Sequence, residues 1–155
     1  MNENLNKSQF KDVPWKDHPQ TSRLYAAEGD WIKSDSSAGQ QLSRRKAQKF
    51  MRSITGTKTK VILDSKLSIR DEQGNAIQPL NGMVHEGNLF VNPKMVGKKF
   101  SKGDITHEAA HIIDDKDGHG PRLASKHLEV VKQHLGQEAH DSLLAHYKKN
   151  GVKLQ

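Results

Sequence analysis

The chain has 155 residues, a formal net charge of +7 and no cysteine. This length fits one domain, and because hydrophobic residues make up only 33% of it, we expect a modest core. The lack of cysteine excludes a disulfide framework, a thiolate metal site and a cysteine nucleophile. No apolar run approaches the roughly 20 residues of a membrane span, and the polar N-terminus lacks the apolar segment of a signal peptide. We therefore expect a cytoplasmic protein with no membrane contact, although a protein exported by another route would show the same pattern.

The predicted elements begin after an extended polar arm over residues 1–20, and a single domain is expected over residues 21–155. The arm is followed by a short helix, because apolar residues recur at helical spacing from Leu24 to Trp31. After a loop, a second helix is predicted over residues 40–54, which leads to a glycine that favours a helix end.

Basic residues are concentrated in this second helix and just after it. Residues 44–60 contain no acidic residue. On a helical wheel, four of the basic side chains fall opposite the apolar residues and so form an outward face: Arg44, Arg45, Lys49 and Arg52. We interpret this face first as a solvated surface, and second as a contact for DNA or RNA.

The middle of the chain has the composition of short strands. Residues 60–69 are rich in Val, Ile and Leu and predict a strand, residues 71–82 predict turns and a loop, and residues 83–91 predict a hairpin. An edge strand placed before a metal-binding helix can hold an extended peptide by adding it to the sheet. His85 in the hairpin is interpreted as a surface residue rather than as part of a cleft.

The segment after this hairpin carries the strongest chemical signal. His107 and His111 are four residues apart, so on a helix their imidazoles share one face and can bind one metal ion. Glu108 lies beside them and can accept a proton from a metal-activated water, as in the HExxH arrangement of metallohydrolases. Ser101 with Asp104 predicts the start of this helix as a variant of the capping box.

A catalytic zinc usually takes three protein ligands and a water. His119 is favoured as the third ligand, because the glycines on either side of it allow the chain to fold back under the helix. Asp117, Glu129 and Glu138 are also candidates for this position.

Two helices are predicted after Pro121, one ending at Gly136 and the other at Gly151. Zinc bound by histidines lowers the pKa of its water towards about 7, and a second donor usually stabilises the oxyanion. Three residues are candidates for that donor: Tyr147, His127 and Arg122.

The run from His107 to Leu123, His-Glu-Ala-Ala-His-Ile-Ile-Asp-Asp-Lys-Asp-Gly-His-Gly-Pro-Arg-Leu, resembles the core of SprT-like (Spartan-type) zinc metalloproteases. More of the chain is similar to a group of small metallohydrolase-like proteins of actinobacteria and phages, which also carry an early segment like Arg23-Leu-Tyr25-Ala-Ala-Glu28. The resemblance implies His107, His111 and His119 as zinc ligands and Glu108 as the base. The insert between the second and third histidines is shorter than in Spartan.

These observations predict an α+β protein with a minimal zincin-like fold. In such a fold, a short antiparallel or mixed sheet packs on the HExxH helix, and further helices lie on both sides. The expected function is a zinc metallopeptidase acting on a protein or peptide substrate. Two further functions are compatible with the sequence: a metallohydrolase that is not a peptidase, and a basic nucleic-acid-binding module with a structural zinc.

Overall fold

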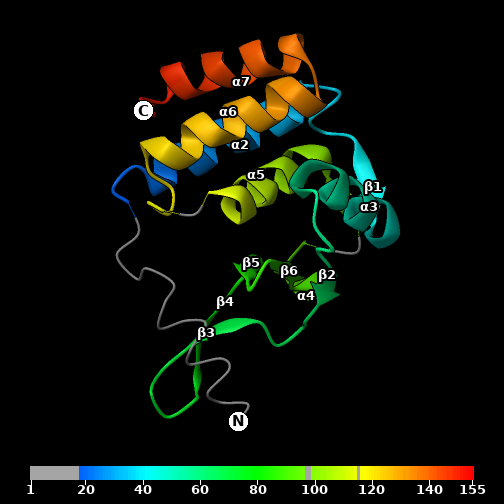
Figure 1. Cartoon of the computed structure of the whole chain (residues 1–155). Coiled ribbons are helices and arrows are strands. Elements are labelled where there is room, and N and C mark those ends of the chain that lie inside the picture. Colours follow the sequence, from blue (N-terminus) through cyan, green and yellow to red (C-terminus); the bar gives the residue numbers. More distant parts are fainter. Residues whose placement is uncertain (1–17, 97–98, 115) are drawn as a thin grey trace.

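The computed structural model describes residues 18–96, 99–114 and 116–155, and it confirms the α+β class (Figure 1). Three helices form one layer: α2 (Thr21–Ser34), α6 (Pro121–His134) and α7 (Gln137–Lys149). The HExxH helix α5 (Lys102–Ile113) lies between this layer and the strands, and α3 (Arg44–Thr55) packs against it. The expected helices on both sides of α5 are therefore present. None of the described helices is long and apolar enough to cross a membrane.

The strands form three small sheets. The first has the order β2-β6-β5, with β2 (Val61–Leu63) parallel and β5 (Gly82–His85) antiparallel to β6 (Asn88–Val91). β1 (Gln41–Ser43) pairs with β7 (Lys99–Ser101), and β3 (Ser68–Arg70) pairs with β4 (Ala76–Pro79). A short helix, α4 (Pro93–Val96), follows β6. The predicted hairpin over 83–91 corresponds to β5 and β6.

Two predictions about strands differ from the structure. The single strand predicted over 60–69 is divided into β2 and β3, because Asp64 caps a turn by accepting hydrogen bonds from the backbone N–H groups of Lys66 and Leu67. The loop predicted over 71–82 contains β4, whose residues are all exposed. An exposed strand has no alternation of apolar and polar residues, so its sequence looks like a loop.

The helix predicted over 40–54 begins later, at Arg44. Residues 41–43 are extended because they pair with β7, and Ser43 then caps the helix by accepting a hydrogen bond from the Lys46 N–H. The helix ends at Gly56, whose φ of 69° is the left-handed conformation that glycine adopts readily.

The buried side chains form two main clusters. One lies between α2, α6 and α7 and includes Trp31, whose indole N–H donates a hydrogen bond to the carbonyl of Ala139. The other joins α3 and α5 to the strands through residues such as Met51 and Ile105. α5 belongs to the second cluster but also touches α6, so the HExxH helix connects the two halves of the core.

The predicted start of α5 is confirmed. The Ser101 hydroxyl lies 3.1 Å from the Asp104 backbone nitrogen, from which it accepts, and 2.7 Å from the Asp104 carboxylate. At Gly103 the helix approaches α2 so closely that a Cβ atom would lie 2.6 Å from Ile32 and 2.9 Å from Trp31. This contact fixes the first turn of α5 against the last turn of α2.

Most of the predicted arm, residues 1–17, lies outside the described residues. Residues 18–20 form a turn that leads into α2, and Gln20 is buried. Its amide donates to the backbone carbonyl of His119 and accepts from the backbone N–H of Lys153. The start of α2 is thereby tied to the turn before α6 and to the C-terminal tail.

Candidate metal centre

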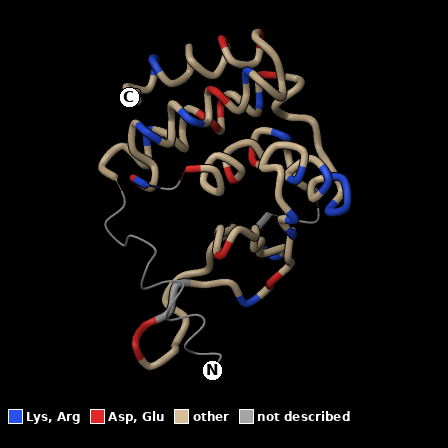
Figure 2. Tube along the Cα trace, in the orientation of Figure 1, with Lys and Arg blue, Asp and Glu red and all other residues tan. Residues whose placement is uncertain are grey.

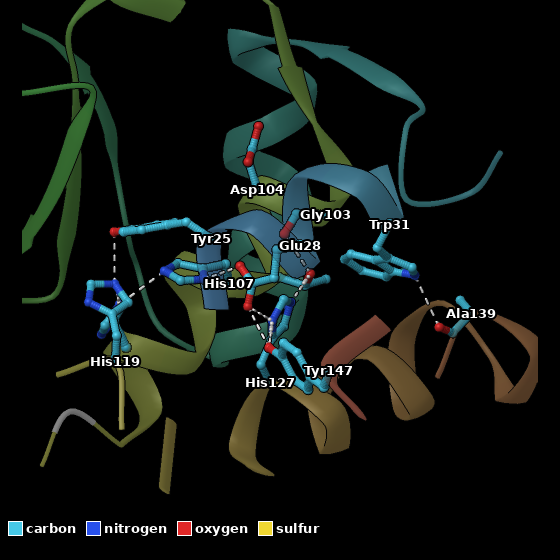
Figure 3. Close-up of polar contacts among 12 residues, drawn as sticks. Tyr25, Glu28, Trp31, Gly103, Asp104, His107, His119, His127, Ala139 and Tyr147 are labelled. Atoms are coloured by element: carbon cyan, nitrogen blue, oxygen red, sulfur yellow. Dashed lines mark hydrogen bonds and ion pairs between the residues drawn. The ribbon is translucent and has the colours of Figure 1, made fainter. Parts of the chain in front are cut away.

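Three histidine side chains converge beside the C-terminal half of α5, and Figure 3 labels two of them, His107 and His119. His107 and His111 lie one turn apart on α5, and His119 comes from the turn before α6. The Nε2 atom of His111 is 3.1 Å from Nε2 of His107 and 3.3 Å from Nε2 of His119. The structure therefore brings together the three histidines that the sequence predicted as the ligands of one metal ion.

The spacing of these nitrogen atoms fits a metal ion. At a Zn–N distance of about 2.0–2.1 Å, two ligands of a tetrahedral ion are roughly 3.3 Å apart, which is close to both measured separations. His107 is buried, whereas His111 and His119 are half-buried, so the group faces solvent on one side. The residues present can hold a metal ion with three nitrogen ligands.

The turn that carries His119 is fixed by Asp117. The Asp117 carboxylate accepts hydrogen bonds from the backbone N–H groups of Arg122 and Leu123, at 2.8 and 3.1 Å, and so caps the first turn of α6. Gly118 adopts a φ of 62°, which permits the reversal. Asp117 is therefore engaged as a cap, and it does not belong to the histidine group.

Glu129 and Glu138, which the sequence also allowed as the third ligand, lie away from the histidine group. Glu129 is exposed on α6 and forms an ion pair of 2.6 Å with Lys126. Glu138 is exposed in the first turn of α7. Neither belongs to a group of described side chains that could hold a metal ion.

Glu108 lies beside the histidines at the border between α5 and β5. It is half-buried, and a Cβ atom built on Gly82 would be 3.6 Å from its Oε2 atom. The Glu108 carboxylate therefore lies in van der Waals range of the first residue of β5. Its position thus links the histidine group to an edge strand.

A buried carboxylate orients His107. Oε1 of Glu28 on α2 is 2.6 Å from Nδ1 of His107, so Nδ1 carries the proton and Nε2 is left to bind a metal. Burial alone would lower the pKa of His107, but the Glu28 carboxylate outweighs burial and raises it to about 9. Metal binding at Nε2 of His107 at neutral pH therefore releases a proton.

Glu28 also holds a second set of buried groups together (Figure 3). Its Oε2 atom accepts a hydrogen bond from the Tyr147 hydroxyl at 2.5 Å and lies 2.9 Å from Nδ1 of His127. Burial lowers the pKa of His127 even though the Glu28 carboxylate acts in the opposite direction. The other ring nitrogen of His127, Nε2, lies 2.8 Å from the Thr106 hydroxyl. Burial would raise the pKa of Glu28, yet His107 and His127 hold it well below its usual range. Glu28 is thus an anion that three side chains stabilise.

The same buried groups Glu28, His107 and His127 are close enough to form a second possible metal site. In this arrangement the facing atoms already satisfy one another as hydrogen-bond donors and acceptors. We therefore regard them as the support of the histidine group rather than as a separate site.

Two of the three predicted oxyanion donors are enclosed in the core, and the third is engaged by a carboxylate. Tyr147 and His127 are fully buried behind His107 and contact Glu28. The Arg122 guanidinium donates to the Asp114 carboxylate at 2.8 Å. Instead, the Tyr25 hydroxyl lies 2.9 Å from Nε2 of His119.

Sequence reasoning did not assign a role to Glu28. The sequence did contain a signal, because Glu28 lies on the same helix face as Leu24, Ala27 and Trp31, all of which are buried. A carboxylate on a buried helix face needs a partner, and the histidines elsewhere in the chain were available as partners.

The predicted basic face is exposed along α3, where Lys and Arg gather in the tube view (Figure 2). Two of its members are partly engaged, since Arg44 and Arg52 donate hydrogen bonds to the carbonyls of Val61 and Thr59. Arg45 and Lys49 complete the face. His85 is half-buried on β5 and forms an ion pair of 3.5 Å with Glu86.

Comparisons with protein-family models, with curated proteins and with solved structures found no match for this chain. The resemblance to SprT-like proteases therefore stays a prediction from the sequence, and functional arguments rest on the site itself.

Proposed function

We propose that this protein is a zinc-dependent metallopeptidase. The observation that carries the proposal is the convergence of three histidine Nε2 atoms, with a glutamate beside them at the border of an edge strand. This arrangement contains the parts that a metal-assisted hydrolysis needs, namely a metal site with a side open to solvent and a base.

The choice of zinc follows from the donor set. Three imidazole nitrogens with no thiolate suit a catalytic zinc, which keeps one position open. When bound, zinc supplies a Lewis acid that acidifies water and polarises a carbonyl group. His107, His111 and His119 would hold it, and Glu28 would keep His107 in the required tautomer.

The proposed role of Glu108 is that of general base. Its carboxylate would accept a proton from the attacking water and then pass it to the leaving amine. The half-buried position of Glu108 beside Gly82 leaves it next to the histidines without making it one of the ligand group.

A peptide is favoured as the substrate because of β5. This strand lies at the edge of its sheet in the described part of the chain, since its partner there is β6 alone. The free edge of such a strand can pair with an extended peptide and hold it in place. Gly82 at the start of β5 adjoins Glu108. A peptide bound along this edge would therefore lie near Glu108, the proposed base. A metallohydrolase with a different class of substrate is the nearest competing function.

The test compares the zinc-loaded wild type with Glu108→Gln on a mixture of unfolded proteins and peptides. We expect the wild type to cleave and the variant to retain zinc but lose at least about a hundredfold in rate, in line with the loss of a general base. Full activity of the variant would contradict the proposed role of Glu108 as the general base. A zinc-loaded wild type that cleaves no peptide would instead favour a metallohydrolase that is not a peptidase.

The exposed basic face of α3 supports a second candidate, a nucleic-acid-binding module in which zinc is structural. For that function we expect DNA binding that weakens steeply with salt, and that is reduced in Arg45→Ala and Lys49→Ala. DNA binding without Glu108-dependent hydrolysis would favour this candidate over the peptidase.

A further inference from the structure

Tyr25 occupies a place at the histidine group that the proposed chemistry has not used. It lies on α2, its side chain is 52% exposed, and its ring centre is 4.8 Å from that of His119 and 5.8 Å from that of His107. The Tyr25 and His107 rings are stacked at 27°. Tyr25 therefore lies across two of the three rings while remaining accessible from solvent (Figure 3).

The hydroxyl of Tyr25 lies 2.9 Å from Nε2 of His119, which is the nitrogen that faces the other ligands. If that nitrogen gives its lone pair to a metal, it can no longer accept a hydrogen bond from the phenol. The phenolic O–H can then donate to a different acceptor that comes to the same place. A substrate oxygen that approaches the metal is such an acceptor.

The helix that carries Tyr25 is held firmly. Leu24, Ala27 and Trp31 bury its inner face, and Glu28, three residues after Tyr25, is bound to His107. One helix thus fixes both the carboxylate behind His107 and the hydroxyl in front of His119. A donor held in this way needs little reorganisation when charge develops on the substrate.

We propose that Tyr25 is the oxyanion-stabilising residue of the site. Its O–H would donate a hydrogen bond to the carbonyl oxygen of the substrate as that oxygen gains negative charge during the attack of water. The proposal rests on the metallohydrolase function proposed above, and it gives Tyr25 the role for which the sequence suggested Tyr147, His127 and Arg122.

The experiment uses the full chain loaded with Co²⁺ in place of zinc, because cobalt reports its ligands in its visible spectrum. Acetohydroxamate, an anionic oxygen ligand that does not need to be a substrate, is titrated into the wild type and into Tyr25→Phe. We expect Tyr25→Phe to retain one cobalt ion per chain and to bind acetohydroxamate about tenfold to a hundredfold more weakly, as for the loss of a hydrogen bond to a charged group. Ser22→Ala, an exposed substitution on the same helix, should match the wild type.

The possible results separate this proposal from the metal site itself. Equal affinity for acetohydroxamate in Tyr25→Phe and wild type would overturn the role of the hydroxyl. Loss of cobalt from Tyr25→Phe would overturn it as well, because Tyr25 would then be a metal ligand. A wild type that binds no cobalt or zinc would overturn the proposed function, and the role of Tyr25 with it.

Discussion

At the scale of single residues, Glu28 supports the proposal that the three histidines bind a metal ion. The carboxylate lies 2.6 Å from the nitrogen of His107 that points away from the ligand group. We predict that Glu28→Gln weakens zinc binding about tenfold to a hundredfold, because a partner of a ligand usually contributes that much to metal affinity. Competition with a chelator of known zinc affinity measures the effect.

The matched control for this prediction is Glu129→Gln. Glu129 is an exposed glutamate on α6 whose partner is Lys126, so the zinc affinity of this variant should equal that of the wild type. If Glu129→Gln weakened zinc binding as strongly as Glu28→Gln, Glu129 would return as a candidate third ligand and the support by Glu28 would be in doubt.

At the scale of elements, the contact between α2 and α5 brings Glu28 to His107. Gly103 permits this contact, because a Cβ atom there would lie 2.6 Å from Ile32 Cγ1 and 2.9 Å from Trp31 Cζ3. We predict that Gly103→Ala lowers the free energy of unfolding by about 1–3 kcal/mol, as overpacking in a core usually does. Urea denaturation of the metal-free protein measures it.

Gly29 provides the control on the neighbouring helix. It lies within α2, and a Cβ atom there would meet nothing within 4 Å. Gly29→Ala should therefore stabilise the protein by up to about 1 kcal/mol, through helix propensity alone. Equal effects of the two substitutions would show that the close approach at Gly103 does not matter for stability.

The helices and strands also show how much of the fold could be predicted from the sequence. The five long helices among the described residues were predictable because their apolar residues repeat every three to four positions and their ends carry local signals, such as Ser101. The four-residue helix α4 was not predicted, because it is too short to show such a repeat. β1 was not predictable, because its three residues are extended only through pairing with β7, far along the chain. The three histidines lie in one short segment, whereas Glu28 is 79 residues from His107. Local spacing could therefore select the candidate ligands but not the carboxylate that supports them.

At the scale of the whole molecule, the histidine group lies where the two main buried clusters meet. Its histidines come from α5 and from the turn before α6. Behind His107, Glu28 connects α2 to His127 on α6 and to Tyr147 on α7. A metal ion bound by the three histidines would thus join four helices, in a chain whose hydrophobic residues make up only 33%.

We therefore predict that zinc stabilises the fold, in addition to its proposed part in catalysis. At a free zinc concentration about 100 times its dissociation constant, binding to the native state adds about 2.7 kcal/mol. For a domain of this size, that corresponds to a rise in Tm of about 5–10 °C. Thermal unfolding with zinc and with a chelator measures the shift. In His119→Ala the shift should be strongly reduced, because the third ligand is lost. A full shift in His119→Ala would place the stabilising zinc at another site, such as the buried group of Glu28, His107 and His127.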